Sequence, residues 1–364
     1  MKISLLHESA VDCSFEKELE EATTKIKHIY NKTRPHKVLY FDNPSYVSGR
    51  MSIVSRKEGE GPIGKYFDKI QNDAKYGQKN FELAEINFLQ ESIWGAIQSA
   101  NLKISDIDLM LSGDLLNQLT TSNYVARNLG LPFLGVYSAC SSMSQALLMG
   151  AVMIDGGHAN NVVCGVSSHF ASAERQFRMP LEYGGQKPPY SQWTVTGAGS
   201  TVLSSKDNGG IRIVKGLMGT VVDMGTHDIA NMGAAMAPAF LHSLVSFFNE
   251  TGTNIDDYDL VVSGDLGKLG SDIARTIALE EGIRLGHKYI DCGAIMYNNY
   301  QNAYQGGSGC ACSATVINGY ILPQMLDKKY KKVLYLATGA LMSPQSTYQG
   351  ESIPCISHGV LFEI

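Results

Sequence analysis

The chain has 364 residues, of which 44% are hydrophobic and 18% charged, and its formal net charge is −5. This composition is ordinary for a globular protein and excludes general disorder. The slightly acidic balance argues against nucleic acid as a partner, because gripping nucleic acid requires a basic face. The length is large for one simple core, so two similar cores or one duplicated unit are expected.

The first 36 residues carry the charged segment EKELEEATTKIKHIY, which we interpret as an N-terminal extension outside the main fold. Few apolar residues precede His7 and Glu8, too few for a signal peptide, and we find no run of about 18 apolar residues that would predict a transmembrane segment. The seven cysteines are an odd number spread over a long chain, which argues against a disulfide framework. The sequence therefore predicts a cytosolic protein, or one held at a membrane only by its partners.

One segment occurs twice in the chain. Residues 103–115 read KISDIDLMLSGDL and residues 254–266 read NIDDYDLVVSGDL. A helix with apolar residues at helical spacing precedes each copy, over 81–100 and 237–250, and each copy leads into a buried strand. The alternation of helices and strands predicts an α/β fold with a predominantly parallel sheet covered on both faces. We expect two duplicated βαβα halves, 37–205 and 206–364, related by a pseudo-twofold axis.

Cys140 lies where a predicted strand gives way to the helix SSMSQALLMGAVMI. At such a turn the helix dipole and unpaired backbone N–H groups favour a thiolate, and the alternative is an inert cysteine packed in a crowded turn. A duplicated α/β unit with a cysteine at this turn of the first half only resembles the thiolase superfamily. The Gly-rich segment WTVTGAGSTVLSS at 193–205 and the final strand HGVLFEI at 358–364 agree with this resemblance.

Longer sequence segments point to one family within this superfamily. DLLNQLTTSNYVARNLGLPF, SSHFASAERQFRMPLEYGGQKP, GGSGCACSA and ATGALMSP resemble, in this order, the stage V sporulation protein AD family of endospore-forming bacteria, from about Val38 to the C-terminus. The resemblance implies a non-catalytic, thiolase-like protein that binds dipicolinic acid (pyridine-2,6-dicarboxylate), as the free acid or its calcium chelate, for uptake into the developing spore. It implies no cofactor.

The same resemblance implies partners and a location. The partners are integral membrane proteins of the same sporulation operon, which would hold the chain at the cytoplasmic face of the forespore or spore inner membrane. Proteins of the wider fold pair through an edge strand of the first half, so a homodimer is expected.

Two loops decide between binding and catalysis. Thiolase-like enzymes carry a His in the loop after the second-half strand and a His or Asn in the next Gly-rich loop. Here these loops read SGDLGKLGSD (263–272) and GGSGCACS (306–313), without either residue type. Condensation requires a base and an oxyanion donor, so we expect binding without catalysis. The alternatives are an acyl-transfer or condensing enzyme that uses Cys140 with a base such as His358 or His169, and a scaffold that binds only proteins.

The expected ligand-binding residues lie on segments that approach Cys140 in this fold, and they include two cations of a Pro/Gly-containing loop. They are Cys140, Ser308, Ser343, His358, Arg175 and Arg178. The cations, with Lys187 beside them, suit a dianion, although a solvated loop is the alternative. Ser343 and His358 could equally satisfy backbone groups. Asp114 and Asp265 recur in the SGDL segments, so helix capping or contact between the halves is expected. Cys310 and Cys312 are expected to be small fillers rather than metal ligands.

Overall fold

The computed structural model describes residues 38–177 and 187–364. Its main sheet has eleven strands, and all but one follow a single order. In that order they are β10 (Tyr289–Asp291), β9 (Leu260–Ser263), β12 (Lys332–Ala340), β13 (Cys355–Glu363), β8 (Arg212–Leu217), β1 (Val38–Ser55), β7 (Gly197–Ser204), β5 (Asn161–Ser168), β3 (Leu109–Gly113) and β4 (Phe133–Gly135). The eleventh strand, β2 (Lys69–Gln71), pairs with β1.

The strand order is symmetric about the middle of the sheet, because each strand of the first half stands as far from one edge as a strand of the second half stands from the other. The copies of the repeated segment form β3 and β9, each of which lies between two parallel neighbours, β4 and β5 or β10 and β12. The strands nearer the middle, β7, β1, β8 and β13, pair antiparallel. The sheet is therefore mixed, and the expectation of a predominantly parallel sheet was wrong. The proposed division between residues 205 and 206 falls between the end of β7 and the start of β8 and stays a prediction.

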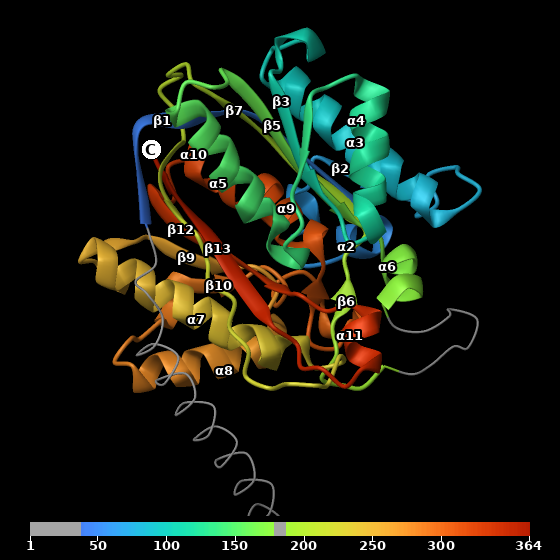
Figure 1. Ribbon diagram of the computed structural model, residues 1–364, viewed down its shortest axis with the longest axis vertical. Coiled ribbons are helices and arrows are strands. Elements are labelled where there is room, and N and C mark those ends of the chain that lie inside the picture. The colour runs from blue at the N-terminus through green and yellow to red at the C-terminus, as the bar shows by residue number, and fades with distance from the viewer. Residues whose placement is uncertain (1–37, 178–186) are drawn as a thin grey trace, which may run out of the picture.

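Helices form three layers around the strands (Figure 1). The outer pairs are α3 (Phe81–Ser99) with α4 (Thr120–Leu129), and α7 (Met232–Thr251) with α8 (Gly267–Glu280). Between the two parts of the sheet lie α5 (Ser142–Asp155) and α9 (Cys310–Val316). Three clusters of buried apolar residues match these layers, and the central one contains both α5 and α9. The central layer thus places the N-termini of two helices, at residues 142 and 310, close to each other.

The outer helices follow the sequence pattern, with one difference at an end. Asn80 caps α3 by accepting a hydrogen bond from the Leu83 N–H, where the apolar periodicity begins. The second helix begins at Met232 rather than at the predicted residue 237, because the helix continues through Pro238. A proline inside a helix removes one backbone hydrogen bond, which makes it a sequence signal for a helix end.

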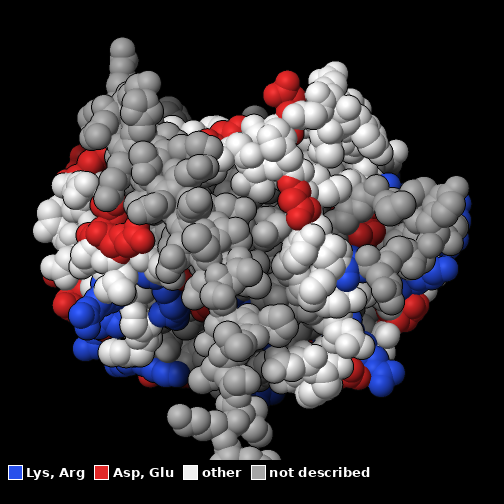
Figure 2. Space-filling model, turned by 90° about the horizontal axis from the view of Figure 1, so that it is seen from below, with Lys and Arg blue, Asp and Glu red and all other residues white. Residues whose placement is uncertain are grey.

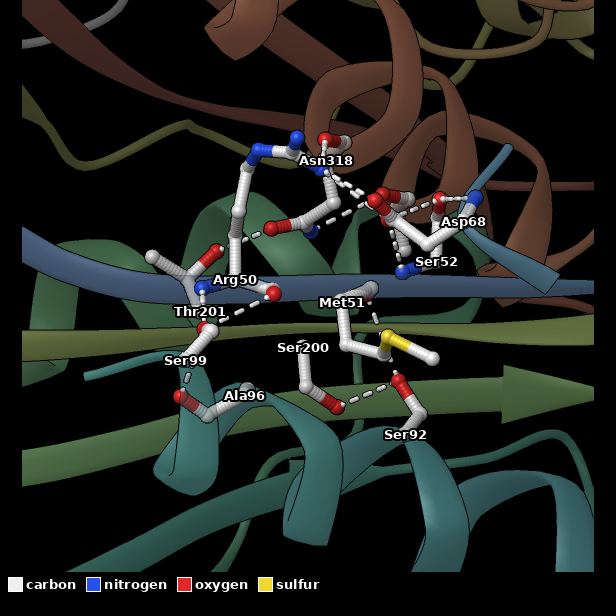
Figure 3. A network of polar contacts seen from close by, with 11 residues as sticks. Arg50, Met51, Ser52, Asp68, Ser92, Ala96, Ser99, Ser200, Thr201 and Asn318 are labelled. Atoms are coloured by element: carbon white, nitrogen blue, oxygen red, sulfur yellow. Dashed lines mark hydrogen bonds and ion pairs between the residues drawn. The ribbon is translucent and has the colours of Figure 1, made fainter. Parts of the chain in front are cut away.

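A network of polar contacts joins β1 to the segment that follows α9 (Figure 3). The π-helical turn Ile317–Ile321 separates α9 from α10 (Leu322–Leu326). Arg50 Nη1 donates to the Asn318 carbonyl at 2.7 Å and pairs with Asp68 Oδ2 at 2.9 Å. Asp68 also accepts from the Ser52 N–H and hydroxyl. The network therefore fixes a strand of the first half against a helix of the second.

The remaining helices are α2 (Arg56–Gly59), α6 (Phe170–Phe177) and α11 (Pro344–Tyr348), and a short pair of strands, β6 (Trp193–Thr194) and β11 (Gly307–Ser308), lies apart from the main sheet. Among the described residues, no helix combines the length and the apolar character that crossing a membrane requires. Basic and acidic side chains occur together on the face seen from below (Figure 2). The predicted extension, residues 1–36, lies outside the described residues.

Candidate functional site

A cavity of about 320 Å³ lies between the two halves of the sequence. Its apolar lining includes Leu115, Ala173, Phe177, Met232, Leu341 and Met342. Its polar lining includes Cys140, Glu174, Thr194, Ser308 and Ser343. Cavities that hold small organic molecules have this size and this combination of apolar walls with a few polar groups. The structure therefore brings together three of the predicted site residues, Cys140, Ser308 and Ser343.

A strained turn presents Cys140 to the cavity. Ala139, just before it, has a φ of 49°, in the left-handed region that alanine seldom adopts. Its carbonyl accepts from the Ser142 hydroxyl at 2.7 Å and from the Cys310 thiol at 3.1 Å. The turn also packs against Gly339, where a Cβ would lie 2.2 Å from the Ser138 carbonyl oxygen. The glycine of β12 and the two donors together hold the turn in place.

Asp265 is the group that faces the Cys140 thiol from the second half. Its Oδ2 accepts from the Ser308 hydroxyl at 2.9 Å and from the Gly309 N–H at 3.0 Å, and its Oδ1 accepts from Thr338 Oγ1 at 3.3 Å. The charge of the same carboxyl group acts on the Cys140 thiol, and Cys140 Sγ lies 4.0 Å from Ser308 Oγ. The two loops in which the resemblance implied histidine or asparagine therefore present a carboxyl group and a hydroxyl group to the cysteine.

These neighbours reverse the expected ionisation of Cys140. Burial, and then the negative charge of Asp265, raise the pKa of the thiol well above its ordinary value. Loss of hydration and a nearby carboxylate both disfavour a thiolate, and here they outweigh the start of α5. The expectation of a favoured thiolate was wrong, because it considered the helix and not the residue opposite. Burial likewise raises the pKa of Asp265 to about 7.

The two histidines considered as bases lie elsewhere. His358, on β13, accepts the Gly219 N–H at Nδ1 at 3.2 Å, and burial lowers its pKa to about 4. His169 contacts the Ala74 carbonyl through Nε2 at 2.9 Å and accepts the Ala171 N–H at Nδ1. Neither is among the residues that line the cavity. His358 thus satisfies a backbone group, and its contact with a ligand stays a prediction.

The predicted cations are placed as follows. Arg175 forms an ion pair with Glu82 at 3.0 Å, and both side chains are partly exposed. Lys187 pairs with the cavity residue Glu174 at 2.6 Å, in a largely buried contact. Arg178 lies outside the described residues. Arg175 does not line the cavity, so a ligand contact by either arginine stays a prediction.

Sequence reasoning missed Asp265 as a site residue, because its recurrence in both SGDL segments suggested a structural role. Its place in the loop that carries the enzyme histidine was the available signal. The two SGDL aspartates are in fact used differently. Asp114 accepts from the Leu116 N–H in the loop before α4 and from the Ser122 N–H in the first turn of α4, so it satisfies one helix N–H without being the N-cap residue.

Among known proteins, the Stage V sporulation protein AD (SpoVAD) family matches residues 35–363. The Stage V sporulation protein AD of Bacillus subtilis (strain 168) is 44% identical over 323 residues, which cover 89% of this chain and 95% of that protein. A variant of OleA from Xanthomonas campestris is similar in structure, with a TM-score of 0.57 at 14% identity over 90% of this chain and 99% of that one.

The 3-oxoacyl-(acyl-carrier-protein) synthase III of Aquifex aeolicus VF5 is also similar, with a TM-score of 0.53 at 14% identity over 88% of this chain and 100% of that one. At this identity the likeness concerns the fold alone. It confirms the thiolase-like α/β fold that the sequence predicted.

Proposed function

Because the chain belongs to the Stage V sporulation protein AD family, we propose that it binds dipicolinic acid in the cavity at Cys140 and serves the uptake of this acid into the developing spore. The observation that carries the proposal is the arrangement of Cys140, Asp265 and Ser308 at the cavity wall. It provides polar contacts for a small ligand without the base that condensation requires.

The cavity suits a compact aromatic acid. Side chains such as Phe177, Met232 and Met342 offer apolar surface to the faces of a ring. The hydroxyl groups of Thr194, Ser308 and Ser343 can donate hydrogen bonds to carboxylates at its edge. A volume of about 320 Å³ admits one such ring.

The chemistry at Cys140 favours binding over turnover. Nucleophilic catalysis requires a thiolate or a base that takes the thiol proton. The raised pKa of Cys140 keeps the thiol protonated, and Asp265, the carboxyl group whose charge acts on it, already accepts three hydrogen bonds. Non-catalytic binding is therefore our proposal for this site.

We also propose that integral membrane proteins of the same operon hold the chain at the spore inner membrane. The support is the family membership, together with the finding that no described helix could cross a membrane. Washing spore membranes with high salt should release the protein into the supernatant, since peripheral contacts are polar. Retention through both a salt and an alkaline carbonate wash would contradict peripheral attachment.

Calorimetric titration of the purified chain with dipicolinate tests the binding proposal. We expect one saturable site, and the same titration with benzoate, which lacks the second carboxylate, should give weaker binding. Incubation with acyl-CoA followed by intact-mass measurement tests the enzymatic alternative. A stable acyl group on Cys140 would overturn the non-catalytic proposal, and a flat titration with dipicolinate would overturn the ligand.

A further inference from the structure

The hydrogen-bond donors at the cavity wall are already engaged by a carboxyl group of the protein. Cys140, Ser308 and Gly309 all line the cavity. Ser308 and Gly309 donate to Asp265, and the charge of Asp265 acts on the Cys140 thiol. Asp265 itself is fully buried and lies behind this wall. A ligand carboxylate that approached these donors would therefore meet a second carboxylate close behind them.

Few of the groups around Asp265 can neutralise the negative charge of its carboxylate. The titratable groups that interact electrostatically with Asp265 are one carboxyl group, five thiols and one phenol. They are Asp291, Cys140, Cys292, Cys310, Cys312, Cys355 and Tyr335. Burial raises the pKa of each of these thiols and of the phenol, so they are neutral near pH 7. Asp291 accepts the hydroxyl of Ser263 and three backbone N–H groups, which favour its charged form, but its burial outweighs them and raises its pKa above the ordinary value.

We infer that Asp265 occupies the anion position of this cavity in the ligand-free protein, and that an anionic ligand binds only together with a proton on Asp265. This inference rests on the proposed binding of a carboxylate in the cavity. Two carboxylates that share one set of donors cannot both stay ionised in a buried site. The proton comes from solvent, forms an O–H bond on Asp265 as the ligand enters, and returns to solvent when the ligand leaves.

The same geometry explains how the donors would change partner. The hydroxyl hydrogen of Ser308 is free to rotate about its C–O bond, so it can leave the neutral Asp265 and donate to the ligand. Gly309 and the turn at Cys140 keep their positions, since the Gly309 carbonyl accepts the Cys312 N–H and the Ser142 hydroxyl donates to the Ala139 carbonyl. Asp265 thereby sets both the charge preference and the pH response of the cavity. The burial that raises its pKa to about 7 would place this response near neutral pH.

Calorimetry in two buffers of different ionisation enthalpy tests the inference on the wild-type chain. Dipicolinate is a dianion above about pH 6, so any proton taken up on binding belongs to the protein. We expect uptake of up to one proton at about pH 8, and an affinity that falls by up to about tenfold for each pH unit above 7. Binding without proton uptake and with constant affinity from about pH 6 to 8.5 would overturn the inference.

Asp265→Asn is the diagnostic variant. It should bind dipicolinate with nearly constant affinity over this pH range and about tenfold more tightly than wild type at about pH 8. Asp272→Asn, an exposed carboxyl on α8, should keep the wild-type pH response. If Asp265→Asn does not fold, the wild-type proton count still decides the question.

A second readout needs no ligand and separates the two proposals. Removing the charge of Asp265 should lower the pKa of Cys140, so iodoacetamide should alkylate Cys140 severalfold faster in Asp265→Asn at about pH 8. An unchanged alkylation profile would overturn the inference even where dipicolinate binds. A changed profile without dipicolinate binding to any variant would overturn the proposed ligand and support the control of the site's charge by Asp265.

Discussion

Asp114 and Asp265 stand at the same position of the two SGDL segments, yet only Asp114 accepts a backbone N–H from the first turn of the helix that follows its own segment. In the second half, Asp291 accepts the N–H groups of Leu266 and Gly267 at the start of α8. Asp265 is thereby left to accept from Ser308 and Gly309 beside Cys140. Because Asp291 accepts the N–H groups at the start of α8, the carboxyl group of Asp265 is available at the cavity.

Asp114 also forms part of a buried acidic pair, which predicts a pH-dependent stability. Burial, and then the charge of Asp114, raise the pKa of Glu85 to about 8. The native state therefore keeps a proton that the unfolded chain loses above its lower pKa. Between about pH 5 and 8 the free energy of unfolding should fall as pH rises, by up to about 1.4 kcal/mol per pH unit.

Glu85→Gln should weaken this dependence, because the amide carries no proton that titrates in this range. Urea unfolding at about pH 6 and pH 8.5 would measure it, and the variant should lose about 1–3 kcal/mol less than wild type between the two. Glu82→Gln, on the same helix but in a partly exposed ion pair, should follow the wild-type curve within about 0.5 kcal/mol. Equal slopes for wild type and Glu85→Gln would contradict the prediction.

The contact between β1 and the π-helical turn predicts a stability effect far from the cavity (Figure 3). Arg50→Met would remove the donor to the Asn318 carbonyl and the cation that pairs with Asp68, which would keep only its contacts with Ser52. Because both groups are partly buried, we expect the free energy of unfolding to fall by about 1–3 kcal/mol. Chemical denaturation followed by circular dichroism would measure it.

Arg56→Met is the matched control for this change. Arg56 pairs with Glu60 across one turn of α2, and both side chains are largely exposed. Exposed pairs of this kind contribute little, so the control should shift the free energy of unfolding by no more than about 0.5 kcal/mol. Similar losses in both variants would mean that the Arg50 network adds nothing beyond an exposed ion pair.

The sequence predicted those parts of the fold that depend on local patterns of apolar residues. The strands at 161–168 and 332–340 are apolar runs between turn residues, and such runs are strong local signals. The antiparallel middle of the sheet was not predicted. Its main element is β1, whose 18 residues pair first with β8 and then with β7. Pairing between segments so far apart in the sequence leaves no local pattern.

The site was predicted in part for a similar reason. Cys140 was found from its place before a helix, and Ser308 and Ser343 from the segments that the resemblance brings near it. The ionisation of Cys140 depends on Asp265, 125 positions away in the numbering of the chain and in the other half. Burial and opposing charge are properties of the folded arrangement, so the local sequence predicted the wrong direction for the thiol pKa.

The open edge of the sheet predicts how two copies would associate. Leu134, on edge strand β4, is 50% exposed. The strand at the opposite edge of the sheet, β10, is largely buried. A homodimer paired through β4 would cover this edge, as exposed edge strands require. Leu134→Lys should therefore yield monomers in light scattering after size exclusion. Leu279→Lys, on α8 and 56% exposed, should remain dimeric, and a wild-type monomer at high concentration would contradict the prediction.

Filling the cavity tests its identity as the dipicolinate site. Cys140→Trp or Ser343→Trp should abolish binding, because an indole at either position would occupy the part of the cavity beside its polar groups, where the ligand carboxylates would bind. Cys140→Ala should weaken binding only several-fold, since Gly309 and the hydroxyls of Ser308 and Ser343 remain. Ser205→Trp, at an exposed position beyond the end of β7, controls for the effect of a new tryptophan and should bind as wild type does. Calorimetry measures all four variants, and circular dichroism checks that each is folded. Full-strength binding by a folded Cys140→Trp or Ser343→Trp chain would place the ligand outside this cavity.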